Sequence, residues 1–150
     1  MERERVVSTA RIIEADRQRL FDLIADPTVH PVIDGSGTVR EVRAQEHPRL
    51  SLGATFGATM RRPWTYRVTN RVVEFEEGRL IAWRHVHGHR WRYEFEDVAG
   101  GTRVVETFDW SSARIRLPIE LLGLPRRNLQ AMRRTLAQLE ELATTGRVGS

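Results

Sequence analysis

Residues 12–36 read IIEADRQRLFDLIADPTVHPVIDGS, and the order of local signals in this stretch decides the fold. The preceding residues, 4–13, are rich in β-branched side chains, which favours an extended strand. Asp16 then stands where a helix N-cap belongs, and apolar residues recur at helical spacing up to Pro27. A second proline and the DGSG sequence at 34–37 leave room for only a brief second helix. The stretch therefore predicts a strand followed by two short helices.

The rest of the chain predicts a large antiparallel sheet and one long helix. Alternation of apolar and polar residues, interrupted by Gly and Pro, predicts strands at 38–45, 54–62, 64–76, 79–87, 89–97 and 102–111. After Pro118, Leu and Met recur at helical intervals among charged residues, so we expect one amphipathic helix ending near Gly146. Pro125 either kinks this helix or marks the start of its regular part. The concave side of a curled sheet is the surface available to cover its apolar stripe.

Composition excludes several kinds of chemistry. The 150 residues include no cysteine, and all 24 basic residues are arginines, so disulfides, thiolate nucleophiles, cysteine-based zinc sites and lysine Schiff bases are excluded. The net charge of +4 is spread among 20 acidic residues, which favours a solvated surface over nucleic-acid binding. We expect one domain over residues 1–150, in the cytoplasm, because no signal region or membrane-spanning apolar run is present.

The predicted order of elements resembles the helix-grip fold of the START and birch-pollen-allergen (SRPBCC) superfamily. Ala15 and residues 17–36 are similar to the segment by which its polyketide cyclase/dehydrase and lipid-transport families are recognised, although Asp16 replaces the usual proline. Residues 32–34 stand where an aromatic residue is frequent, and Gly-Thr-Arg-Val at 101–104 also matches. The resemblance implies an α+β fold with a seven-stranded curved antiparallel sheet around a long C-terminal helix, and two short helices between strands 1 and 2. It also implies an elongated apolar cavity, which family members use for lipids, sterols and polyketide intermediates.

The segment from Ile81 to Phe95 carries aromatic residues at alternate positions. A hairpin whose loop is centred on Gly88 would pair residues that lie equally far before and after it. Ile81 would then lie opposite Phe95, Trp83 opposite Tyr93 and His85 opposite Trp91. The rings of Trp83, His85, Trp91 and Tyr93 would then point inward together. They either fill the core against the last helix or border a cavity, where their polar atoms find partners more easily.

Candidate ligand-binding residues come from the inward face of each element. Asn70 is a polar amide on an otherwise apolar face, where it hydrogen-bonds either a ligand carbonyl or water. Val29 and His30 belong to the expected lid of the pocket. The full predicted set is Phe21, Ile24, His30, Phe56, Met60, Tyr66, Asn70, Trp83, His85, Trp91, Tyr93, Met132 and Leu136.

Candidate catalytic groups are few. His85 is the only catalytic candidate, as a general acid or base, and the alternative is a packed, hydrogen-bonded histidine. His85, His87 and His89 share a strand face, but the turn and the lack of a neighbouring acidic ligand favour a solvated rim, so we expect neither metal nor cofactor.

The last predicted strand leaves open which carboxylate faces inward. It is either Glu106 or Asp109, and a carboxylate near His85 would form an acid/base couple. The pair Arg61 and Arg62 either reaches a ligand anion at the pocket mouth or carries ordinary strand-end charges.

Three functions compete. The first is binding of a small hydrophobic or aromatic molecule, lipid or polyketide-like, in a cavity between the sheet and the C-terminal helix. The second is an enzyme of the cyclase, aromatase or dehydratase type that uses neither metal nor covalent Lys or Cys chemistry. The third is a protein-interaction module. The expected partner is a small hydrophobic molecule, without membrane insertion or nucleic acid, and the expected state is a monomer or homodimer.

Overall fold

The computed structural model describes residues 5–36, 39–44, 49–60, 64–113, 116–121 and 123–148. The elements follow one another as β1 (Val6–Ile13), α1 (Arg17–Ile24), a 3-10 turn η1 (Pro27–Val29), α2 (His30–Ile33), β2 (Val39–Ala44), β3 (Thr55–Met60), β4 (Tyr66–Glu76), β5 (Leu80–His85), β6 (Arg90–Val98), β7 (Gly101–Asp109), α3 (Arg116–Leu121) and α4 (Leu124–Thr145). Each predicted strand is present, within a few residues of its predicted ends.

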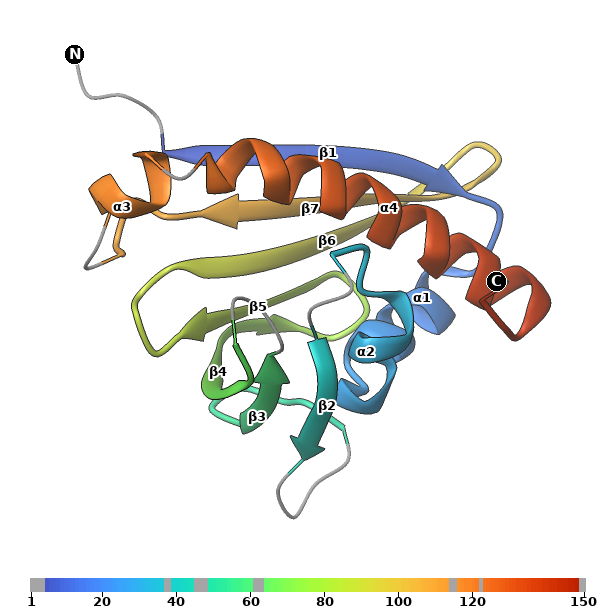
Figure 1. The fold of residues 1–150 in the computed structure, drawn as a ribbon. Helices are drawn as coiled ribbons and strands as arrows, with labels where there is room; N and C mark the ends of the chain where they lie inside the picture. Colours follow the sequence, from blue (N-terminus) through green and yellow to red (C-terminus); the bar gives the residue numbers. More distant parts are fainter. Residues whose placement is uncertain are drawn as a thin grey trace.

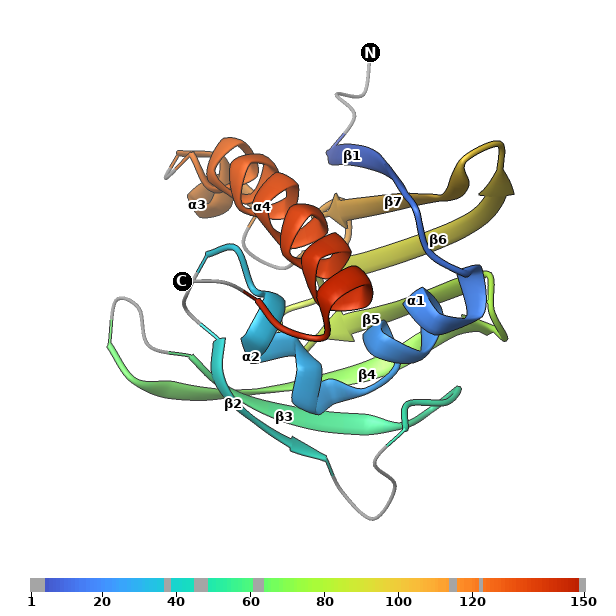
Figure 2. The same cartoon turned by 90° about the vertical axis from the view of Figure 1, so that its right-hand side faces the viewer.

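All strands belong to one antiparallel sheet of seven strands in the order β1-β7-β6-β5-β4-β3-β2. The first and last strands therefore pair, with Val6 opposite Asp109. The sheet is curved, and α4 crosses its concave side while α1 and α2 lie beside the C-terminal part of that helix (Figures 1 and 2). This arrangement confirms the predicted helix-grip fold. Within the described residues, no helix combines the length and apolar character that crossing a membrane requires.

The two short helices begin and end where the sequence predicts. The Asp16 side chain accepts a hydrogen bond from the Arg19 backbone N–H, which caps the start of α1. Asp26 does the same for the 3-10 turn through the Thr28 N–H at 3.0 Å. The buried side chains of α1 are Leu20, Phe21 and Ile24, which share one helix face.

The C-terminal region forms two helices, so the prediction of one helix after Pro118 was wrong. Gly123 separates α3 from α4 and adopts a left-handed conformation at φ 68°, which interrupts helical hydrogen bonding. Pro125 lies in the first turn of α4, where its missing N–H costs nothing. Gly146, also left-handed, ends α4 with its N–H donating to the Leu142 carbonyl at 2.8 Å, as predicted.

The pairing of β5 with β6 differs from the predicted one by two residues. Trp83 lies opposite Trp91 and Ile81 opposite Tyr93, so the turn is centred one residue before Gly88. A shift of two leaves every side chain on its predicted face, because side chains alternate with a period of two. The inward direction of the aromatic side chains therefore holds although their partners change.

Candidate functional site

The inner, concave face of the sheet changes in burial along the strands. One end, which we call the closed half, consists of side chains at most 4 % exposed: Leu20, Phe21, Ile81, Phe95, Val104, Leu136 and Leu139. The other end, toward the β5–β6 turn, is the open half: Met60, Tyr66, Asn70, His85, His89 and Trp91. Of the open half only Asn70 is buried, whereas Tyr66 is 36 % exposed and the other side chains are half-buried. The difference arises because α1, α2 and the C-terminal part of α4 lie over the closed half (Figure 2).

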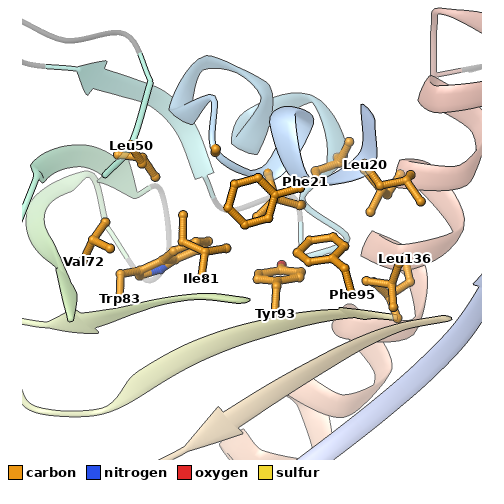
Figure 3. Close-up of a cluster of buried hydrophobic side chains, with 14 of the residues drawn as sticks. Leu20, Phe21, Leu50, Val72, Ile81, Trp83, Tyr93, Phe95 and Leu136 are labelled. Atoms are coloured by element: carbon orange, nitrogen blue, oxygen red, sulfur yellow. The ribbon is translucent and has the colours of Figure 1, made fainter. Parts of the chain in front are cut away.

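Aromatic rings connect the lid to the sheet. The His30 imidazole stacks on the Trp83 indole with ring centres 4.9 Å apart, and Phe56 meets both rings edge-on at 5.5 Å. His30 Nε2 donates to the Ile24 carbonyl at 2.8 Å, and burial lowers the pKa of His30. His30 is therefore a neutral, half-buried residue that packs α2 against β5. Figure 3 shows Trp83 and Tyr93 side by side on the sheet, below Phe21.

Glu106 is the carboxylate that faces inward, which decides the question that the sequence left open. Its side chain is 1 % exposed and accepts a hydrogen bond from the Tyr93 hydroxyl at 2.8 Å. Burial raises the pKa of Glu106 to about 8, the Tyr93 bond opposes this shift, and the nearby charge of Asp34 adds to it. Burial likewise raises the pKa of Tyr93. Glu106 consequently carries its proton at neutral pH.

Asp109 occupies the other face of β7 and is ordinary by comparison. It is half-buried, pairs with Arg90 at 3.2 Å and accepts from the Ser111 N–H at 2.9 Å. Burial alone would raise its pKa, but the hydrogen bonds from Ser111 and the charge of Arg90 lower it overall. In the sequence, Glu106 alternates in step with Val104 and Phe108, which are buried on the same face of β7. This alternation alone did not identify the inward carboxylate, because the opposite face also carries an acid, Asp109.

A polar row in the open half consists of Asn70 on β4, His85 at the end of β5 and His89 in the turn before β6. Asn70 lies opposite His85 across β4 and β5, and the two imidazoles stack at 4.3 Å with planes 16° apart. Burial lowers the pKa of His85 to about 4 and that of His89 to about 3, and the charge of His87 acts in the same direction. The His87 N–H donates to His85 Nδ1 at 3.0 Å, so the proton of the neutral His85 ring resides on Nε2.

The structure does not bring His85 and Glu106 together. Glu106 lies opposite Tyr93, and Tyr93 lies opposite Ile81. His85 follows Ile81 by four residues on β5, which is about 13 Å along an extended strand. In the described part of the chain, no three His, Cys, Asp or Glu residues are grouped so that they could hold a metal ion.

A contact that the sequence did not indicate fixes the segment after α2 to α4. The Gly35 N–H donates to Thr135 Oγ1 at 2.9 Å, and Arg134 Nε donates to the Gly35 carbonyl at 2.9 Å. A Cβ atom at Gly35 would clash with the Ala131 carbonyl oxygen, so only glycine fits against the helix there. The partners are about a hundred residues apart in sequence, and no local pattern could have identified them.

The other predicted ligand-binding residues are distributed over both halves. Phe21, Ile24 and Leu136 lie in the main apolar cluster, and Met132 lies in a second cluster with Phe108 and Trp110. Met60 and Tyr66 pair across β3 and β4 at the open end. Arg61 and Arg62 lie outside the described residues. The remaining residues of the predicted set are Phe56, Trp83 and Tyr93, which are buried in the main apolar cluster.

Residues 4–144 match a protein family described as polyketide cyclase / dehydrase and lipid transport. An uncharacterised protein of Mycobacterium tuberculosis, Rv0088, is 37% identical over 147 residues, which cover 94% of this chain and 65% of that protein. The chain thus spans slightly less than two thirds of the length of this relative.

Solved structures show the same fold at low sequence identity. The crystal structure of Ms6760 from Mycobacterium smegmatis has a TM-score of 0.72 at 16% identity, covering 96% of this chain and 94% of that one. The Polyketide_cyc-like protein Cgl2372 from Corynebacterium glutamicum has a TM-score of 0.60 at 19% identity, covering 97% and 95%. At these identities, the likeness bears on the fold alone.

Proposed function

The chain belongs to the polyketide cyclase/dehydrase and lipid transport family, and we propose that it binds one small, mainly apolar molecule between the open half and α4. One observation carries this proposal: the inner face is packed at one end, yet leaves aromatic and polar side chains half-buried at the other. Apolar surface with a few convergent polar groups is the usual composition of a small-molecule site. The ligand class is lipid or polyketide-like, with affinity supplied mainly by burial of its apolar surface.

Trp91 is the central contact in this proposal. Its ring packs against both apolar clusters and lies 4.7 Å from the Phe108 ring, centre to centre. Because Trp91 is only half-buried, a bound aromatic or alicyclic group would cover its remaining surface. Trp83, which lies opposite Trp91 across β5 and β6, is buried and packs against Tyr93 with ring centres 5.6 Å apart. The closed half then serves as the rigid support of the site.

Titration with the neutral fluorescent probe N-phenyl-1-naphthylamine tests the proposal. We expect saturable binding to one site and a Trp91→Ala variant that binds about tenfold more weakly, in line with loss of an aromatic contact and its buried area. Arg92→Ala is the matched control, because Arg92 is the next residue of β6 and pairs with Glu74 through its side chain. Equal affinities of the two variants, or no saturable binding, would contradict the proposal.

A second candidate function is a cyclase- or dehydratase-type enzyme, and the Glu106–Tyr93 pair favours it. A buried carboxylic acid that keeps its proton at neutral pH and contacts a hydroxyl group is suited to general acid chemistry. Product analysis with a polyketide-like substrate and the Glu106→Gln variant tests this role, because glutamine keeps the shape and cannot donate the acid proton. Turnover by Glu106→Gln equal to the unmodified chain removes Glu106 from the mechanism, and the same measurement on His85→Ala tests the predicted catalytic histidine.

A further inference from the structure

The polar row brings three hydrogen-bonding side chains to one spot on the inner face. Asn70 comes from β4, His85 from the end of β5 and His89 from the residue before β6. The His85 N–H donates to the His89 carbonyl at 2.8 Å, which fixes the two backbones relative to each other. The imidazole rings of His85 and His89 stack on each other, which fixes the orientation of both side chains. Two strands and one backbone hydrogen bond across the turn therefore position the three groups.

Two members of the row have polar atoms without a protein partner. Asn70 is 7 % exposed, and its side-chain amide makes no hydrogen bond within the described part of the chain; its amide atoms are not among the fully buried ones, so they stay accessible to a ligand or to water. His89 Nδ1 is buried and also has no partner there. A buried imidazole nitrogen is almost always hydrogen-bonded in native proteins, so His89 Nδ1 points to a molecule that completes it, beside the accessible amide of Asn70.

The row offers donors and acceptors without a net charge. Burial lowers the pKa of both imidazoles far below neutrality, to about 4 and about 3 for His85 and His89, and an amide does not ionise. The flanking inward residues are Phe56, opposite Asn70, and Phe108, whose ring lies 5.5 Å from that of His89. Two of the charged side chains near the row are engaged elsewhere: Glu120 accepts from Trp110 and Arg5, and Asp109 pairs with Arg90. His87 is exposed on the turn, and its ring lies 5.0 Å from that of His85.

We propose that the polar row binds an uncharged hydroxyl or ketone oxygen of the ligand and disfavours carboxylate and ammonium groups. The inference rests on the proposed function, since it assigns the polar end of the same ligand. An ionised group at the row would lose its water and meet no opposite charge. A hydroxyl or carbonyl oxygen would instead accept from the Asn70 amide or His85 Nε2, and a hydroxyl would also donate to His89 Nδ1.

Four probes that share a naphthalene ring separate the alternatives: 2-methylnaphthalene, 2-naphthol, 2-acetonaphthone and 2-naphthoate, titrated into the full chain at neutral pH. We expect 2-naphthol and 2-acetonaphthone to bind about fivefold to tenfold more tightly than 2-methylnaphthalene, the range of a net hydrogen bond. We expect 2-naphthoate to bind more weakly than 2-methylnaphthalene. Asn70→Leu should remove the advantage of 2-acetonaphthone and leave 2-methylnaphthalene unchanged, whereas Thr69→Ala, at an exposed neighbouring position, should change neither.

NMR of the unmodified chain provides a second measurement that needs no variant to fold. The side-chain amide signals of Asn70 and the ring nitrogen signals of His89 should shift with 2-naphthol and much less with 2-methylnaphthalene. Equal affinity of the hydroxyl and methyl probes, or tighter binding of 2-naphthoate, would overturn the inference while the proposed function stands. Failure of all four probes to bind would overturn both.

Discussion

The closed and open halves of the inner face share strands β5 and β6 but are covered differently. Over the closed half lie α1, α2 and the C-terminal part of α4, whereas at the open end Ile119 of α3 and Met132 of α4 pack with Phe108 and Trp110. In the closed half, Phe21 meets Phe75 and Phe95 edge-on at 5.6 and 5.5 Å, and its side chain is wholly buried. In the open half, Trp91 has a comparable ring but stays half-buried. One face of a sheet can therefore supply the core at one end and a binding surface at the other, and the covering helices decide which.

The largest expected change in stability comes from a substitution in the closed half. Phe21→Ala should lower the free energy of unfolding by about 3–5 kcal/mol, because it removes a fully buried ring and leaves a cavity. Trp91→Ala should cost clearly less, because part of its ring already contacts solvent. Urea denaturation of both variants measures the difference. If the two substitutions cost the same, the open half belongs to the core and the distinction between the halves fails.

The next effect concerns Glu106, between the two halves. Its pKa in the folded protein is about 8, above the ordinary 4.5, so the folded state holds the proton over that window and the free energy of unfolding falls as pH rises from about 4.5 to 8. Glu106→Gln should abolish this slope and increase stability near pH 8 by on the order of 3 kcal/mol.

Urea denaturation between about pH 5 and pH 9 measures this slope. Asp109→Asn is the matched control on the same strand, since the pKa of Asp109 is lowered and its contribution is lost only as pH falls below the ordinary range. A slope that persists in Glu106→Gln would show that another group causes it.

A smaller effect probes how tightly the lid closes. Gly35→Ala should lower the free energy of unfolding by about 2 kcal/mol, because the added methyl group meets the backbone of α4. Gly57→Ala on β3 adds the same group where its nearest neighbour, the Val68 carbonyl oxygen, is 3.6 Å away, so it should change stability little. Thermal unfolding of the two variants compares them directly. Equal melting temperatures would mean that the segment after α2 shifts away from α4 at little cost and is not held tightly against it.

A further effect lies in the open half at acid pH. Because the pKa values of His85 and His89 are below the ordinary 6.5, the unfolded chain binds protons first, and stability falls as pH decreases from about 6.5 toward 4 and 3. NMR titration of the imidazole signals measures these pKa values. Titration of both rings near 6.5 would show that the polar row is exposed to water, which would contradict the desolvated, uncharged row proposed above.

The sequence predicts the elements well because they depend on local patterns. The strands follow from alternation and α1 from its cap at Asp16, but a pattern of period two cannot distinguish pairings that differ by two, so the partners of Trp83 and Tyr93 were wrong while their faces were right. The inward position of Glu106 could be recognised only from the pairing of β7 with β6, which places Glu106 opposite Tyr93.

The parts that sequence reasoning missed depend on tertiary contacts. The polar row was only partly predicted: Asn70 and His85 were named, whereas His89 was assigned to a solvated rim. Its ring instead stacks on His85 and meets Phe108 at 5.5 Å, contacts that join two strands and a turn. Gly123 gave no sign that it would separate α3 from α4, because glycine is also tolerated within helices at moderate cost.

The pairing of β1 with β7 has a consequence for the order of folding. Val6 meets Asp109, and β2 lies at the opposite edge of the sheet, so β1 has no neighbouring strand until β7 has been synthesised. The helix that covers the concave face, α4, emerges later still. During translation the inner faces of β4 to β6 therefore stay uncovered by α4 until the end of synthesis. We expect the slow steps of folding to be the docking of β1 and of α4, because both depend on contacts between residues far apart in the sequence.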